Sequence, residues 1–242
     1  MSAEKKQSEQ QTGADVVVKT LEQHDVKWVF GVPGAKIDKV FNTLVDSSIK
    51  TVVCRHEQNA AFIAGGIGRM TGKAGVAIAT SGPGVSNLVT GLATANTEGD
   101  PVIALGGAVA LSDRLKKIHQ TMDSVSVCKP VTKYSAEVDS PGSVSEVMTN
   151  AFRSAESDRP GAAFVSLPMD IMVAPSKCEV LAPPAYSGAG PADTTAIKEA
   201  ARLINLAKRP VVLLGLLASK PQNAAAVHEL IESGKLRSES VV

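Results

Sequence analysis

The sequence predicts an α/β fold, with a mostly parallel sheet flanked by helices. Short β-branched runs alternate with segments of helical spacing every few tens of residues, which is typical of βαβ units. The expected strand cores, at 52–53, 75–79 and 102–105, are continuously apolar, as strands are when helices cover both faces of a sheet. Aromatic residues make up only 3% of the chain, so Val, Ala, Leu and Ile must build the core.

The elements follow one another between residues 13 and 182. After Gly13, Val17 and Leu21 have helical spacing, and the short apolar run "KWVFGVPG" is stopped by Gly and Pro. The next expected elements are a helix at 36–47, a strand at 50–55, a helix at 57–72, a strand at 74–79, a helix at 85–99, strands at 100–109 and 131–138, a helix at 143–157 and a strand at 161–170. Each strand thus alternates with a helix or a glycine turn, as a parallel sheet requires.

The remaining segments suggest further divisions of the chain. Residues 1–12 are charged and Gln-rich, and we expect a disordered tail there. Residues 183–192 are rich in Pro, Gly and Ala, and we expect a linker. Residues 193–242 begin a second α/β domain, with a helix, a buried strand at 211–219 and another helix. One strand and two helices are too few to close a stable core, so we expect this domain to be incomplete.

Composition argues against several classes of protein. The net charge of +1, without basic runs or interleaved aromatic residues, gives no case for nucleic acid or a membrane surface as a partner. Cys54, Cys128 and Cys178 are far apart and show no CxxC spacing, so we expect reduced thiols. No apolar run reaches the ~18 residues of a membrane span, and the polar N-terminus resembles no targeting signal. These features predict a cytoplasmic protein.

Ligands of open parallel sheets bind beyond the carboxyl ends of the strands, so the turns after strands are the candidate sites. They lie at 30–38, 54–59, 80–87 and 105–113. The turn "TSGPGVSN" could be a phosphate cradle ahead of a helix N-terminus. It could instead be a tight strand–helix turn, with Ser81 as the cap and Pro83 in the first helical turn.

Glu57 stands where an expected strand gives way to a helix. The helix macrodipole favours an acid in the first turn without any function. However, the residues "NAAFIAGG", which follow in the same helix, provide few polar neighbours for the carboxyl group. An acid in such surroundings suits exchanging a proton with a heterocyclic nitrogen. His56 and His119 are candidates for acid–base work or ordinary surface residues.

Five motifs occur together in one order. They are "FGVPGAKID", "RHEQNAAFIAGGIGRMTGKAGV", "TSGPGVSNLVTGLATANTEGDPVIALGG", "HQTMD" and "GAAFVSLPMDI". Together they resemble the N-terminal half of the acetolactate synthases, which depend on thiamine diphosphate. The "PGAKID" form resembles the catabolic, acetoin-pathway type rather than the biosynthetic type that carries FAD, so FAD is not expected.

The resemblance implies a pyrimidine-binding α/β domain at 13–182 and the start of a central α/β domain at 193–242. The family's Mg²⁺ and diphosphate motif, GDG with a later Asn pair, is missing from this sequence, so the chain is expected to contain no ligands for Mg²⁺ and to be inactive alone. The family's active site lies between subunits, which implies a homodimer or homotetramer acting on pyruvate.

The resemblance also implies roles for particular residues. Glu57 would hydrogen-bond the aminopyrimidine ring of thiamine diphosphate, Lys36 would attract the carboxylate of pyruvate, and Gln120 would lie near the substrate. The other residues implied to contact the cofactor are Pro33, Gly34 and Ala35 in a loop over the reacting carbon, and Thr80, Gly82, Pro83 and Asn87 around the pyrimidine.

Other functions stay open on the sequence alone. Another thiamine enzyme, such as a pyruvate oxidase or a 2-oxo acid decarboxylase, would share most of these motifs. A non-catalytic α/β subunit or interaction module would explain the missing diphosphate motif. A nucleotide-binding domain would depend on the "SGPG" turn alone.

Overall fold

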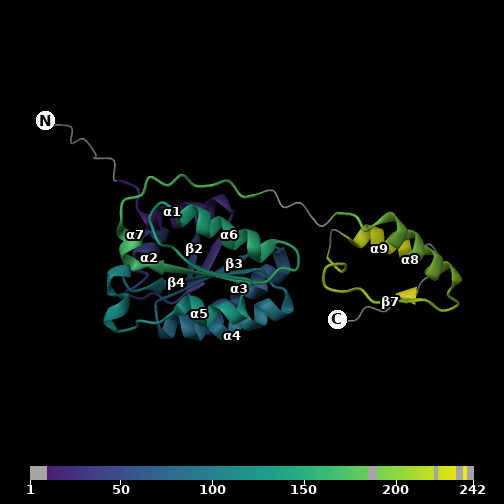
Figure 1. The fold of residues 1–242 in the computed structure, drawn as a ribbon, viewed down its shortest axis with the longest axis horizontal. Coiled ribbons are helices and arrows are strands. Elements are labelled where there is room, and N and C mark those ends of the chain that lie inside the picture. Colours follow the sequence, from purple (N-terminus) through teal and green to yellow (C-terminus); the bar gives the residue numbers. More distant parts are fainter. Residues whose placement is uncertain (1–9, 185–189, 221–222, 233–236, 239–242) are drawn as a thin grey trace. The chain divides into compact units, whose positions relative to one another are not determined.

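The computed structural model describes residues 10–184, 190–220, 223–232 and 237–238 (Figure 1). The chain divides into two compact units, Met1–Tyr186 and Ser187–Val242.

The first unit is built on one parallel sheet. Its strands are β1 (Trp28–Gly31), β2 (Lys50–Val53), β3 (Gly75–Ala79), β4 (Val102–Ala108), β5 (Tyr134–Glu137) and β6 (Ala162–Pro168). They lie in the order β2-β1-β3-β4-β6-β5, and every neighbouring pair is parallel. The predicted α/β fold is therefore confirmed.

Helices cover both faces of this sheet (Figure 1). The helices are α1 (Gly13–Gln23), α2 (Asp38–Val45), α3 (Glu57–Thr71), α4 (Pro83–Glu98), α5 (Ser124–Cys128), α6 (Val144–Glu156) and α7 (Met169–Val173), with short 3-10 helices η1 (Leu111–Lys116) and η2 (Lys129–Val131). Helices α1, α2, α6 and α7 contribute to one core, and α3, α4 and α5 to the other.

Strand β4 shows why the strand cores are continuously apolar. Ile103 and Leu105 belong to the first core, whereas Val102 and Ala104 belong to the second. Successive side chains of a strand point to opposite faces, so a strand covered on both faces must be apolar at every position.

The N-terminal end of the described chain is more ordered than expected. Thr12 caps α1 in a capping box with Asp15, and the Ser176 amide donates to the Gln11 carbonyl oxygen at 2.7 Å. An isolated bridge also joins Thr12 to Pro175. The expectation of a disordered tail through residue 12 is therefore wrong for Gln11 and Thr12, because the distant 175–178 segment supplies their partners. Residues 1–9 lie outside the described residues.

The second unit has far less structure. It contains α8 (Thr194–Leu206), α9 (Ala224–Glu232) and a two-stranded parallel pair, β7 (Val211–Val212) and β8 (Arg237–Ser238). The buried strand expected at 211–219 is wrong: only two residues are extended, and Leu213 is 70% exposed. Too few neighbouring layers surround this strand to bury it. Half of the expected linker, at 185–189, lies outside the described residues.

Among the helices that the structure describes, none has the length and apolar character needed to cross a bilayer.

Candidate functional site

The turns after β1 and β3 meet at a switch in strand order. The chain leaves β1 toward β2 on one side and returns as β3 on the other side, so the two turns are neighbours at the carboxyl edge of the sheet. A side chain at Gly34 would place its Cβ atom 2.6 Å from Cβ of Thr80. The backbone amide of Lys36 donates to Thr80 Oγ1 at 3.4 Å. Glycine at position 34 therefore lets the two turns touch.

Glu57 is the first residue of α3, directly after the turn that follows β2. The side chain of His56 caps this helix: its Nδ1 accepts from the Gln58 amide at 3.1 Å. The Glu57 carboxylate leans toward α4, where Asn87 Nδ2 donates to Glu57 Oε2 at 3.0 Å. The two carboxylate oxygens of Glu57 therefore differ, because the Asn87 side-chain amide donates to Oε2 and not to Oε1.

The second oxygen of Glu57 lies beside the glycine turn. A Cβ atom added to Gly84 would be 3.5 Å from Glu57 Oε1, so the absence of a side chain there keeps space beside this oxygen. Ala60, Ala61 and Ala64 follow Glu57 at helical spacing and are fully buried in the core. Glu57 therefore sits, half-buried, at the end of the core-facing stripe of α3.

The surroundings of Glu57 agree only in part with the sequence-based expectation. The apolar stripe is present on its own helix, but a polar partner comes from the neighbouring helix. The pocket-lining role of Asn87 stays a prediction, and what the structure shows is that its side-chain amide donates to the Glu57 carboxylate.

The turn after β3 is joined to Gln120. Ser81 is buried, and its Oγ donates to Gln120 Oε1 at 3.3 Å. Gly82 has a φ of +62°, and a Cβ atom there would lie 3.1 Å from Cα of Gln120. The expectation that Ser81 caps α4 is wrong, because Gly82 is the N-cap residue and no side chain caps the helix. The Ser81 hydroxyl donates to Gln120 instead. Pro83 is the first residue of α4, as expected.

The segment 80–87 therefore connects the other predicted residues. Thr80 contacts the Gly34–Lys36 loop, Ser81 and Gly82 contact Gln120, and Asn87 holds Glu57. Separate turns of the sequence are in this way assembled at one edge of the sheet.

The loop after β1 is more open. Pro33 and Ala35 are exposed at its surface, and Lys36 is half-buried. No hydrogen bond or ion pair joins the Lys36 ammonium group to another of the described residues. Gly107 of β4 leaves room for the backbone here, since a Cβ atom there would be 2.5 Å from the Lys36 carbonyl oxygen.

Sequence reasoning missed three residues of this arrangement. They are Ser81 as the partner of Gln120, Gly84 beside the Glu57 carboxylate, and Gly107 under the Lys36 backbone. The closely spaced glycines of "SGPG" and "LGG" signal a close approach of backbone, but they do not say which residue approaches.

Other reactive side chains do not form a second site here. His56 is used as a cap, and His119 is exposed. Burial raises the pKa of the Cys128 thiol to about 12, which keeps it protonated and unreactive. Within the described ranges, no three His, Cys, Asp or Glu side chains are grouped closely enough to hold a metal ion.

Comparison with protein families agrees with this geometry. Residues 11–127 match the N-terminal thiamine pyrophosphate-binding domain of thiamine pyrophosphate enzymes. This part of the chain belongs to that family. The matched range includes the turns after β1, β2 and β3, Glu57, Asn87 and Gln120.

Several curated acetolactate synthases are similar over most of the chain. The catabolic acetolactate synthase of Raoultella terrigena is 55% identical over 216 residues, which are 89% of this chain and 39% of the relative. The acetolactate synthase of Bacillus subtilis is 49% identical over 93% of this chain, again 39% of the relative. The acetolactate synthase isozyme 1 large subunit of Escherichia coli is 39% identical over 93% of this chain, which is 40% of the relative. The chain thus spans about two fifths of these relatives.

Proposed function

We propose that this chain is the pyrimidine-binding part of an acetolactate synthase, which condenses two pyruvates to 2-acetolactate with loss of CO₂. The observation that carries the proposal is the position of Glu57: the carboxylate begins α3 at the carboxyl edge of the sheet, with one oxygen held by Asn87 and the other beside Gly84. Similarity to a catabolic relative supports a role in acetoin formation.

The residues present fit the pyrimidine ring of thiamine diphosphate. Gly84 places backbone without a side chain beside the acid, and Gly82 does the same beside Gln120, which would leave room for a flat ring. Asn87 orients the carboxylate, so Glu57 Oε1 is the oxygen that we expect to hold the proton shared with a ring nitrogen. The cofactor, when bound, supplies the carbon nucleophile and accepts the electrons released with CO₂. Thr80, Gly82, Pro83 and Asn87 would line this pocket.

The loop after β1 would serve the substrate. Its half-buried lysine, Lys36, carries a charge that suits the carboxylate of pyruvate. Pro33, Gly34 and Ala35 would lie over the reacting carbon. Gly34 lies close to Thr80, and the amide of Lys36, the residue after Ala35, donates to Thr80 Oγ1. Gln120, bonded to Ser81, would lie beside the substrate on the other side of the same turn.

The rest of the catalytic machinery would come from elsewhere. Mg²⁺ and the diphosphate would be held by a diphosphate-binding domain, FAD would not be needed, and the chain by itself would be inactive. The site would form in a cytoplasmic homodimer or homotetramer. A groove between α3 and α4, lined by Gly65, Gly66, Gly91 and the exposed Phe62, supports close subunit packing there.

A chimera tests the proposal. This chain would replace the matching segment of the Raoultella terrigena acetolactate synthase, and acetolactate would be measured with pyruvate, thiamine diphosphate and Mg²⁺. We expect activity in the chimera and none in the chain alone. Glu57→Gln should lower the rate by about 100-fold or more, because the neutral amide cannot exchange the proton.

Glu146 provides the matched control, since it is an exposed acid in the first turn of α6. Glu146→Gln should leave the rate unchanged. A Glu57→Gln chimera at the parent rate would remove Glu57 from its proposed role. Acetyl phosphate or acetaldehyde as the main product would instead favour a pyruvate oxidase or a 2-oxo acid decarboxylase.

A further inference from the structure

The segment 111–122, which carries Gln120, leaves the carboxyl edge of the sheet as an excursion between β4 and α5. Its start is tied to the fold by the Leu111 amide, which donates to Asp170 Oδ2 at 3.1 Å. Its end passes into α5, where Asp123 Oδ1 accepts from the Ser126 amide at 3.0 Å. Between these two points, the segment must hold Gln120 against the turn after β3.

The backbone of this segment is strained at two positions. Lys117 has a φ of 48° and Gln120 a φ of 67°, a region that residues with side chains rarely adopt. Such conformations persist only where surrounding contacts hold them. The segment therefore needs an anchor between its ends.

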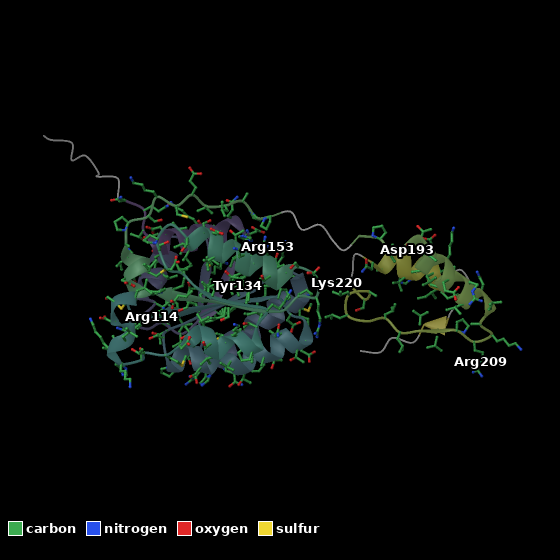
Figure 2. All side chains as sticks on the ribbon, viewed as in Figure 1. Arg114, Tyr134, Arg153, Asp193, Arg209 and Lys220 are labelled. Atoms are coloured by element: carbon green, nitrogen blue, oxygen red, sulfur yellow. The ribbon has the colours of Figure 1, made fainter. Side chains whose placement is uncertain are left out.

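One side chain of the segment, that of Arg114 (labelled in Figure 2), pairs with a residue of the sheet. Arg114 forms an ion pair with Oε2 of Glu137, the last residue of β5. The same oxygen accepts from Ser166 Oγ at 2.9 Å, and Ser166 lies opposite Glu137 in the adjacent strand and is 1% exposed. The acceptor is therefore held by the buried sheet, whereas the donor is the more exposed partner: the Arg114 side chain is 40% exposed and that of Glu137 only 18%.

The space beneath the segment is poorly filled. A cavity of about 130 Å³ is lined by Arg114, Glu137, Thr121, Met122 and other residues. The Thr121 hydroxyl is buried there and has no hydrogen-bond partner among the described residues. Leu111 and Met122 pack against the two cores near the ends of the segment, which leaves the ion pair as the contact between its middle and the sheet among the described residues.

We propose that Arg114 is a positioning residue: through Glu137 it holds the segment 111–122 so that Gln120 stays against Ser81 and Gly82. The part that concerns substrate depends on the proposed function, in which Gln120 lies near pyruvate. The contact itself does not depend on it.

Hydrogen–deuterium exchange on the 242-residue chain tests the contact. Arg114→Ala should speed amide exchange in 111–122 and in the turn 81–84 by about tenfold, with the rest of the first unit unchanged. Arg114→Lys should restore part of the protection, because it keeps the charge but not the planar guanidinium. Lys116→Ala is the matched control, since Lys116 lies in the same 3-10 helix and pairs only locally with Asp113.

Unchanged exchange in Arg114→Ala would overturn the proposal, and so would faster exchange throughout the first unit, which would indicate a general loss of stability. A second arm uses the acetolactate synthase chimera. There, Arg114→Ala should raise the KM for pyruvate about fivefold. The thiamine diphosphate concentration needed for half-maximal activity should stay unchanged. Lys116→Ala should change neither.

The two arms separate two kinds of failure. Faster exchange with an unchanged KM would overturn the positioning role while the proposed function stands. A wild-type chimera that makes no acetolactate would contradict the proposed function, and the exchange result alone would then decide whether Arg114 anchors the segment.

Discussion

The two units of the chain differ in how far their apolar side chains are buried. In the first unit, large side chains such as Phe152, Phe164 and Leu105 are almost completely buried between sheet and helices. In the second unit, no residue of α8, β7 or α9 is buried. Leu203, for example, is 55% exposed on a helix that is otherwise well formed and capped by Asp193.

The comparison separates local structure from core formation. Helix α8 has its cap and its apolar stripe, both of which depend on residues close in sequence. Burial depends instead on other layers of structure, which six strands and their covering helices provide in the first unit. A two-stranded pair with two helices provides too little surface to exclude water.

The largest expected difference between the units is the cost of removing an apolar side chain. Phe164→Ala should lower the free energy of unfolding of the first unit by about 3–5 kcal/mol, because it empties a fully buried site. Leu213→Ala, at a 70% exposed site of the second unit, should change the free energy of unfolding of that unit by less than about 0.5 kcal/mol. Denaturant unfolding followed by circular dichroism measures both. Similar costs at the two sites would mean that the second unit is packed after all.

Close helix packing should distinguish positions within the first unit as well. A Cβ atom at Gly91 of α4 would lie 2.4 Å from Cβ of Ala61 in α3, so Gly91→Ala should destabilise the unit by about 1–3 kcal/mol. Gly66 of α3 has open space around it, so Gly66→Ala should stabilise by roughly 0.5–1 kcal/mol through helix propensity. Thermal unfolding of the two variants checks the opposite signs, and a stabilising Gly91→Ala would contradict the close contact.

A half-buried histidine should make the first unit sensitive to acid. His24 stacks on Phe152 at 3.9 Å, and burial, together with the nearby Lys73, lowers the pKa of His24 to about 4. Between pH 6.5 and 4, the His24 imidazole is protonated in the unfolded chain and neutral in the folded chain. Stability is therefore complete above pH 6.5 and falls as the pH is lowered toward 4, by roughly 1–2 kcal/mol.

His24→Phe keeps a ring beside Phe152 and removes the titration. The difference in unfolding free energy between wild type and this variant should therefore depend on pH between 6.5 and 4. A difference that stays constant over this range would show that His24 is not the group responsible.

The smallest expected effect is that of removing the second unit. A chain ending at Tyr186 should unfold within about 2 °C of the 242-residue chain, because the first unit has its own complete core. Calorimetry on the two chains makes the measurement. A drop of 10 °C or so would show that the second unit supports the first.

Much of the fold could be predicted from the sequence because it depends on near neighbours. The apolar strand core expected at 75–79 coincides with β3 (Gly75–Ala79), and the helix expected at 143–157 is observed at Val144–Glu156. The placement of Glu57 at the start of a helix also follows from local signals, since a β-branched run ends just before it. Which turns lie together at the carboxyl edge follows less directly, from the rules of parallel sheets.

The sequence by itself determined the α/β pattern, the apolar strand cores and the candidate turns, because periodicity and turn residues act over a few positions. Only the tertiary structure decided that Asn87 holds Glu57, that Ser81 bonds Gln120 rather than capping α4, and that the run at 211–219 is not buried. The bonded pairs lie 30 and 39 residues apart in sequence, and burial depends on layers that other segments supply. No local pattern specifies such partners, because the folding of the whole sheet brings them within bonding distance.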